Sequence, residues 1–167
     1  MKMKSLVLLA VLGFAFSAFS DVENAENAKI SRDALIKCEV ETAISLLQAI
    51  HIKQQSGEMT IEVAKKLGAD LLRELKYGTD GYFWADTTGG VNVVLYGRKD
   101  VEGRNRLEDK DGNGVFYVKE FLEKGKGEGG YVNYSFSKKG EAAQQPKRSY
   151  VLEFKPFGWV VGTGYYL

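Results

Sequence analysis

The chain has 167 residues, enough for one compact domain with little left for a second. Its 23 Lys and Arg residues nearly balance its 22 Asp and Glu residues, so the formal net charge is only +1. This balance argues against nucleic acid as a partner, because phosphate recognition needs a surplus of basic side chains.

The first twenty residues have the pattern of an export signal. Lys2 and Lys4 provide a basic start, and the mainly apolar stretch Leu6–Phe19 follows. That stretch has 14 residues, fewer than the roughly 20 that span a bilayer. We expect residues 1–20 to be a cleavable signal peptide and residues 21–167 to be a single periplasmic or secreted domain. An uncleaved anchor is the alternative.

Aromatic residues are distributed unevenly along the rest of the chain. Residues 21–76 contain no Phe, Tyr or Trp, whereas all nine Tyr and both Trp lie from Tyr77 onward. Most of the glycines lie in that second part too. A uniform helical bundle and an all-β chain are both excluded by this asymmetry, which predicts an aliphatic helical half and an aromatic half.

The aliphatic half is predicted to form two helices. Apolar residues from Ile36 to Ile50 recur at helical spacing and predict a long helix that ends near Ser56. Thr60 is a plausible N-cap for a second helix, which runs towards Tyr77. Cys38, the only cysteine, excludes an intramolecular disulfide, and its place in the first helix predicts a small buried side chain.

The aromatic half changes to an alternating pattern typical of strands. This half is predicted to contain a hairpin, a short helix and three further strands, with a polar linker before the last two strands. The fold class is therefore α+β with an antiparallel sheet. The predicted elements are strands 81–86 and 91–96, helix 115–124, strand 129–137, linker 138–147, and strands 149–155 and 158–166.

Six short blocks in this half occur in an order that resembles a known family, the single-Cache domain of the second subtype. This module is the extracytoplasmic sensor region of bacterial chemoreceptors and sensor kinases. The resemblance implies a PAS-like antiparallel sheet of five to six strands, with a long N-terminal helix and a second helix packed against it. The blocks are Tyr77–Trp84, Glu102–Asn105, Lys110–Gly114, Gly127–Tyr134, Pro146–Val151 and Gly158–Tyr165.

The resemblance also implies a pocket on the sheet for a short carboxylate such as acetate, propionate, lactate or pyruvate. Two features depart from the family. Tyr96-Gly97 stands where members often have His-Pro, and the chain ends at Leu167, where receptors continue into a transmembrane helix. We therefore expect a stand-alone sensory protein that signals through a membrane receptor or sensor kinase, or dimerises through its first helix.

A buried carboxylate needs cations and hydrogen-bond donors in an otherwise apolar shell. The aromatic half supplies both, and Lys147 is the strongest candidate because it lies in the Pro146–Val151 block. The predicted ligand-binding residues are Trp84 as an apolar wall, Arg104 and Lys147 as charge partners, and Tyr96, Tyr134 and Tyr150 as hydroxyl donors.

The acidic loop from Asp109 to Glu120 supports an alternative function. Asp109, Asp111, Asn113 and Glu120 match ligand positions of a calcium-binding EF-hand loop. On this interpretation the chain is a Ca²⁺-stabilised structural or interaction protein. The segment before the loop is a poor entering helix, however, and the same residues fit a plain turn.

Residues for catalysis are scarce. His51 is the only histidine, and it lies thirteen positions from Cys38 on the same predicted helix. That separation is about 20 Å along the helix axis, too far for a hydrogen bond between the two side chains. We therefore expect neither an enzyme nor a bound cofactor.

Overall fold

The computed structural model describes residues 4–96 and 98–167, with side chains from residue 22 onward. Two compact units, Met1–Leu35 and Ile36–Leu167, divide the chain, and helix α1, Lys4–Gln55, contributes to both. The side chains of the predicted signal peptide, and Gly97, lie outside the described residues, so the signal peptide stays a prediction. Within the described part of the chain, no helix combines the length and apolar character needed to cross a bilayer.

The first unit is helical, and its described residues are mostly exposed. Lys29 lies 3.6 Å from Glu26 and 3.8 Å from Asp33, one turn away on either side. Such surface pairs contribute little to stability, because solvent screens them and two long side chains must be ordered.

The helices of the second unit follow the sequence closely. The end of α1 is followed by Gly57, whose φ of 83° suits glycine in a tight turn. Helix α2, Ile61–Glu74, then begins at Thr60, whose hydroxyl accepts a hydrogen bond of 3.3 Å from the Val63 N–H. The predicted helix end and N-cap are both confirmed.

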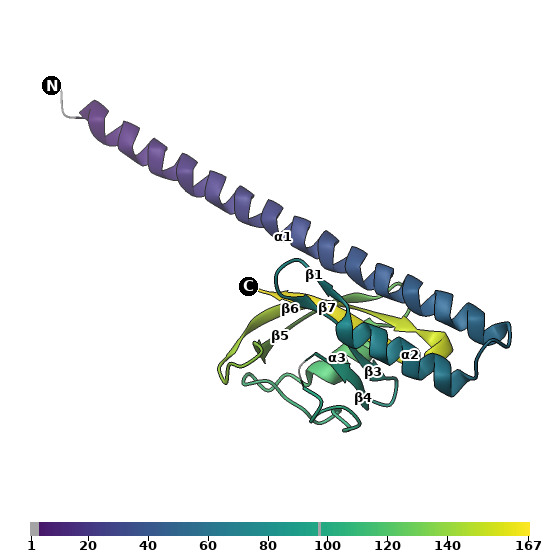
Figure 1. The fold of residues 1–167 in the computed structure, drawn as a ribbon. Helices are drawn as coiled ribbons and strands as arrows, with labels where there is room; N and C mark the ends of the chain where they lie inside the picture. Colours follow the sequence, from purple (N-terminus) through teal and green to yellow (C-terminus); the bar gives the residue numbers. More distant parts are fainter. Residues whose placement is uncertain (1–3, 97) are drawn as a thin grey trace. The chain divides into compact units, whose positions relative to one another are not determined.

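An antiparallel five-stranded sheet forms the centre of the second unit, with strand order β4-β3-β7-β6-β5 (Figure 1). The two-stranded pair β1–β2 precedes it, and helix α3 and a 3-10 turn lie between strands. This arrangement confirms the α+β prediction. The elements are β1 Lys76–Tyr77, β2 Gly81–Tyr82, β3 Trp84–Thr87, β4 Asn92–Leu95, α3 Tyr117–Lys124, β5 Gly130–Ser137, β6 Gln144–Phe154, the 3-10 turn Lys155–Phe157 and β7 Trp159–Tyr166.

Strand β6 begins earlier than the sequence predicts. Residues 144–147 belong to the strand rather than to a polar linker, and Pro146 pairs with Ser135 of β5. The carbonyl of Pro146 accepts a hydrogen bond of 3.0 Å from the Leu167 N–H. The start of this strand is not recognisable in the sequence, because its residues are polar and include a proline. As a result, Lys147 lies inside the sheet, between Tyr134 of β5 and Tyr166 of β7.

The two faces of the sheet pack against different helices because alternate strand residues point to opposite sides. On one face, the part of α1 beyond Ile36 and helix α2 enclose a cluster that includes Leu47, Leu72 and Trp159. On the other face, α3 packs its Phe121 against Trp84 and Val151. Cys38 is exposed on α1, so its predicted burial is wrong: it lies beside the buried stripe of Ile36 and Val40 rather than on it.

Candidate functional site

A small cavity lies on the α3 face of the sheet. It encloses about 190 Å³ of space not filled by atoms, part of it open to solvent. The enclosed part has room for about one water-sized group, so only a very small ligand could enter it, and the wall would have to move to admit one. Leu95 and Arg106 complete a wall that is otherwise aromatic, made of Tyr82, Trp84, Tyr117, Phe121, Tyr134 and Phe136.

Trp84 reaches this wall because its cross-strand neighbour is a glycine. Trp84 of β3 pairs with Gly162 of β7. A Cβ atom at position 162 would come within 2.5 Å of the Trp84 ring, so any larger residue would displace the indole. The pairing therefore lets the indole pack across β7 and against Phe121 at 5.3 Å between ring centroids.

Two buried hydrogen-bond donors in the cavity wall lack an acceptor. Neither Trp84 Nε1 nor Arg106 Nε has a hydrogen-bond partner among the residues that the structure describes. Such groups are rare in folded proteins, because leaving a buried donor unpaired costs about 1–3 kcal/mol. Both belong to residues that line the same cavity, so the wall is suited to a ligand that carries acceptor atoms.

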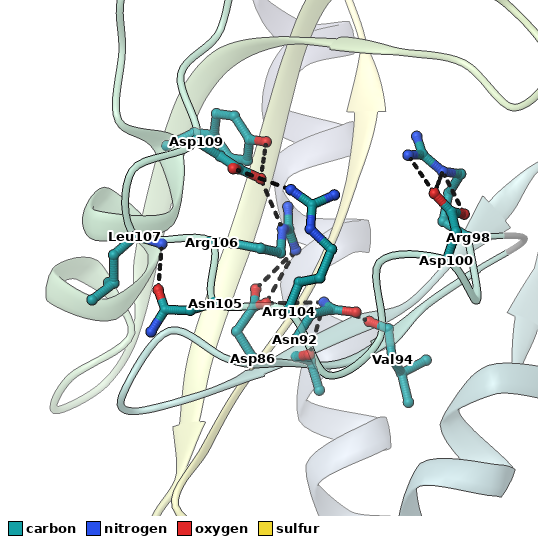
Figure 2. A network of polar contacts seen from close by, with 12 residues as sticks. Asp86, Asn92, Val94, Arg98, Asp100, Arg104, Asn105, Arg106, Leu107 and Asp109 are labelled. Atoms are coloured by element: carbon teal, nitrogen blue, oxygen red, sulfur yellow. Dashed lines mark hydrogen bonds and ion pairs between the residues drawn. The ribbon is translucent and has the colours of Figure 1, made fainter.

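Arg106 is held in place by acidic residues (Figure 2). Its Nη1 lies 3.1 Å from the Asp86 carboxylate, and its Nε lies 3.5 Å from Asp109 without forming a hydrogen bond. Asn92 donates a second hydrogen bond of 2.9 Å to Asp86. Burial raises the pKa of the Asp86 carboxyl, although Arg106 and Asn92 pull it down. Arg106 is thus a fixed cation with Asp86 on one side and the cavity on another.

Lys147 lies behind the wall in a cage of aromatic rings. Its Nζ donates a hydrogen bond of 2.6 Å to the Tyr82 hydroxyl and lies 4.3 Å from the Tyr82 ring centroid. It also lies 4.9 Å from the Tyr166 ring and 5.2 Å from the Trp84 ring. Only 1% of Lys147 is exposed, and no carboxylate among the described residues lies within ion-pair distance. Burial lowers the pKa of Lys147 from 10.5 to about 7.

A second, outer recess adjoins the cavity. It encloses about 490 Å³, open solvent included, and shares the residues Tyr82, Leu95 and Phe136 with the inner cavity. Its rim is cationic, with Arg98, Lys138 and Lys139 against the single acid Glu141 among the lining residues. The recess that adjoins the cavity is therefore lined by more positive than negative charge.

Two of the six predicted ligand-binding residues, Trp84 and Tyr134, line the cavity. Lys147 does not line it, but it donates a hydrogen bond to Tyr82, which does. The Tyr134 hydroxyl also forms a hydrogen bond of 3.2 Å with the Ser149 hydroxyl. Burial raises the pKa of Tyr134. Whether these residues bind a ligand stays a prediction.

The other three predicted residues lie elsewhere. Tyr96 lines the outer recess and stacks on Tyr82, with ring centroids 5.7 Å apart. Arg104 is exposed and lies 3.9 Å from Asp109, because it belongs to a surface loop. Tyr150 points to the opposite face of the sheet, where it packs with Ile36 and Val40 of α1.

Sequence reasoning missed Arg106 and most of the aromatic wall. Tyr82 could have been found, since it lies two residues before Trp84 on the same side of an alternating segment. No sequence pattern marks Arg106, because it belongs to no helix or strand. Its burial against Asp86 is seen only in the structure.

The acidic loop is organised by hydrogen bonds from backbone N–H groups of the loop and of β5 to Asp111. Asp111 accepts hydrogen bonds of 2.9, 2.9 and 2.8 Å from the N–H groups of Asn113, Val115 and Ser135. These bonds hold the pKa of Asp111 below its usual range, although burial alone would raise it. Among the described residues, no three His, Cys, Asp or Glu side chains gather where they could hold a metal ion. The geometry is that of an Asx-type turn rather than of an EF-hand loop.

Comparison with known proteins places these features in a family. The model of the family described as Single Cache domain 2 matches residues 28–167. The methyl-accepting chemotaxis protein McpP of Pseudomonas putida is 30% identical over 130 residues, which cover 77% of this chain and 24% of that protein. The sensor histidine kinase MctS of Rhizobium johnstonii is 30% identical over 174 residues, covering 98% of this chain and 37% of the kinase. This chain thus spans about a quarter to just over a third of the length of these relatives.

Two solved structures share the fold. A periplasmic sensor domain of a chemotaxis protein has a TM-score of 0.79 at 29% identity, covering 82% of this chain and 96% of that one. A Cache chemosensory domain whose structure explains its recognition of carboxylic acids has a TM-score of 0.80 at 29% identity. That match covers 85% of this chain and 97% of the other.

Proposed function

This chain belongs to the single Cache domain 2 family, whose members are extracytoplasmic sensor domains, and from this premise we propose that it binds a short carboxylate in the cavity beside Arg106 and Trp84. The observation that carries the proposal is the buried donor Trp84 Nε1, which has no hydrogen-bond partner among the described residues, in the same cavity wall as the buried Arg106 guanidinium, whose Nε lies 3.5 Å from Asp109 without a hydrogen bond. The carboxylic-acid recognition described for a structural neighbour supports the same ligand class.

The charge of the cavity suits one carboxylate. Asp86 already offsets the charge of Arg106. The positive charge that balances a bound carboxylate is therefore proposed to come from Lys147. Lys147 acts on the ligand through Tyr82, which lines the cavity and whose hydroxyl oxygen accepts the hydrogen bond from Nζ. Hydrogen bonds that involve a charged group are about twice as strong as neutral ones, and the aromatic wall excludes competing water.

The ligand-bound domain is proposed to act in signal transduction outside the cytoplasm. The relatives in which this domain occurs are a chemotaxis receptor and a sensor kinase, so we propose a membrane receptor or kinase as the recipient of the signal. Export through the predicted signal peptide and dimerisation through α1 stay part of this proposal.

The experiment that tests the ligand is calorimetry of the purified domain with acetate, propionate, lactate and pyruvate. Replacement of Lys147 by Met keeps the length of the side chain and removes its charge. We expect Lys147→Met to weaken binding by about 2 kcal/mol, or roughly 30-fold, the typical strength of a charge-assisted hydrogen bond.

Lys155→Met is the matched control, because Lys155 is exposed in the 3-10 turn and lies outside the cavity. The control is expected to bind as tightly as the wild type. A wild-type protein that binds none of the four acids contradicts the carboxylate proposal, and equal losses in both variants would contradict the role of Lys147.

A further inference from the structure

The segment Val101–Arg106, here called the strap, runs along the outer edge of the sheet. It follows β4, which stands at one end of the strand order of the described sheet. Figure 2 shows Arg104 and Arg106 of the strap beside Asn92 of β4. Three main-chain hydrogen bonds attach the strap to β4 and to the turn before it. They run from the Gly103 N–H to the Asn92 carbonyl at 2.8 Å, from the Asn92 N–H to the Arg104 carbonyl at 2.9 Å, and from the Arg106 N–H to the Gly90 carbonyl at 2.8 Å.

The strap reaches both faces of the sheet. Its first residue, Val101, is 4% exposed and packs in the cluster that includes Trp84 on the α3 face. Its last residue, Arg106, is 2% exposed and lies on the same face, in the wall of the cavity. Glu102 extends instead to Arg73 of α2, the helix that packs on the opposite face. The strap therefore connects the cavity wall with α2 around the edge of the sheet.

The contact between the strap and α2 is a bidentate ion pair. Arg73 donates two hydrogen bonds of 3.0 Å to the Glu102 carboxylate, one from Nε and one from Nη2. Its Nη1 donates a hydrogen bond of 2.8 Å to Asp70 on the same helix. Both side chains of the pair are only 20% exposed. Two parallel charge-assisted hydrogen bonds in a half-buried place fix geometry better than a solvated pair does, so this pair fixes the position of the strap relative to α2.

Ligand entry bears on this contact. The enclosed part of the cavity has room for about one water-sized group, so part of its wall has to move when an acid binds. Arg106 belongs to that wall and is four residues from Glu102 on the strap. A displacement of the Arg106 backbone is therefore resisted at the bonds to β4 and at the Arg73–Glu102 pair. When a binding site and a distant contact affect each other in this way, linkage requires that each changes the free energy of the other by the same amount.

We propose that the Arg73–Glu102 pair couples the cavity to α2. Arg73 is a positioning residue: through Glu102 and the strap it holds Arg106 in the orientation that a bound carboxylate needs. A bound carboxylate in turn stabilises the pair, and with it the last turn of α2, so α2 responds to the occupancy of the cavity. This inference rests on the proposed carboxylate site and adds a route by which binding reaches the opposite face of the sheet.

The first test is calorimetry with whichever of acetate, propionate, lactate and pyruvate binds the wild type most tightly. Arg73→Met and Glu102→Gln are each expected to weaken binding about fivefold, at the lower end of couplings between sites. The double variant, which leaves neither charge of the pair without its partner, is expected to lose no more than either single variant. Asp70→Asn is the matched control, because Asp70 bonds to Lys66 and Arg73 within α2. It is expected to bind the acid as tightly as the wild type.

The second test measures α2 itself, by hydrogen exchange followed by NMR with and without the same acid. The Leu75 N–H bonds to the Leu71 carbonyl at 2.9 Å and reports on the last turn of α2. Saturation with the acid is expected to slow exchange of this amide about fivefold in the wild type and to have no effect in Glu102→Gln. A pair that served only the stability of the fold would protect this amide equally with and without ligand.

Circular dichroism identifies the folded variants, and three variants of the pair allow for one that fails to fold. The coupling is overturned by wild-type affinity in the folded single variants, by additive losses in the double variant, or by an equal loss in Asp70→Asn. A wild type that binds the acid without any change in exchange at Leu75 also overturns it. Each of these results leaves the carboxylate site standing, whereas a wild type that binds none of the four acids overturns the carboxylate proposal and the coupling with it.

Discussion

The two faces of the central sheet bury different kinds of side chain. The face covered by α1 and α2 is filled by aliphatic and aromatic residues, and its one fully buried polar side chain among the described residues is Thr163, which bonds to Tyr77. The face covered by α3 buries Asp86, Arg106 and Lys147 among its aromatic rings. Burial of charge costs stability unless it is fully compensated. The comparison indicates that one face mainly stabilises the fold, whereas the other, where we propose the ligand site, carries the cost of buried charge.

The largest effect is expected from truncation on the α1 face. Leu47 is fully buried between α1 and α2 and contacts none of the cavity residues named above. Leu47→Ala should lower the free energy of unfolding by about 2–5 kcal/mol, because it leaves a cavity in close-packed surroundings. Urea denaturation measures the loss, and calorimetry should find carboxylate affinity unchanged in the folded protein.

Ile52→Ala is the control for that experiment, since Ile52 lies on the same helix and is 56% exposed. It should change stability by less than about 0.5 kcal/mol. A Leu47→Ala variant that retains its fold but loses ligand affinity would show that the two faces do not act independently.

The second expected effect is a dependence of stability on pH that arises on the α3 face. In the folded protein the pKa of Lys147 is about 7, whereas in the unfolded chain it returns to 10.5. Between these values the unfolded chain binds more protons, so the free energy of unfolding should rise with pH, by up to about 1.4 kcal/mol per pH unit. Denaturation of the wild type and of Lys147→Met from pH 6.5 to 9 isolates the contribution of this lysine.

Ligand binding should depend on pH in the opposite direction. A bound carboxylate favours the charged ammonium, so above pH 7 binding requires uptake of a proton and affinity should fall by up to about tenfold per pH unit. If the ratio of carboxylate affinities of the wild type and Lys147→Met is constant over this pH range, the pKa of Lys147 is not lowered.

The smallest effect is expected from Arg104, which the sequence predicted to be a charge partner of the ligand carboxylate. Its side chain is 57% exposed and lies outside the cavity. Arg104→Ala should leave carboxylate affinity within about twofold, because solvent screens an exposed charge. Arg106→Lys, which keeps the charge but loses the buried Nε donor, should cost about tenfold in the same titration. If Arg104→Ala lowers carboxylate affinity more than Arg106→Lys does, the ligand binds at the surface loop rather than in the cavity.

Much of the fold could be predicted because local chemistry determines it. Apolar spacing from Ile36 to Ile50 fixes the buried face of α1, and the Thr60 hydroxyl fixes the start of α2. Side chains alternate along a strand, and Phe83 and Trp84 accordingly lie in the clusters on opposite faces of the sheet. Strand β6 was one exception, since its first residues are polar and include Pro146. The predicted strand 81–86 was another, because its first residues form β2 and pair with the unpredicted β1, apart from β3.

The amino-acid sequence by itself determined the order of elements, the family and the division into an aliphatic and an aromatic half. Those properties depend on periodicity and on neighbours along the chain. Only the tertiary structure decided which cation faces the cavity. Arg104 and Arg106 are two residues apart and chemically identical, yet one lies in solvent and the other against Asp86. That choice depends on long-range packing of the loop against β3, which no local pattern records.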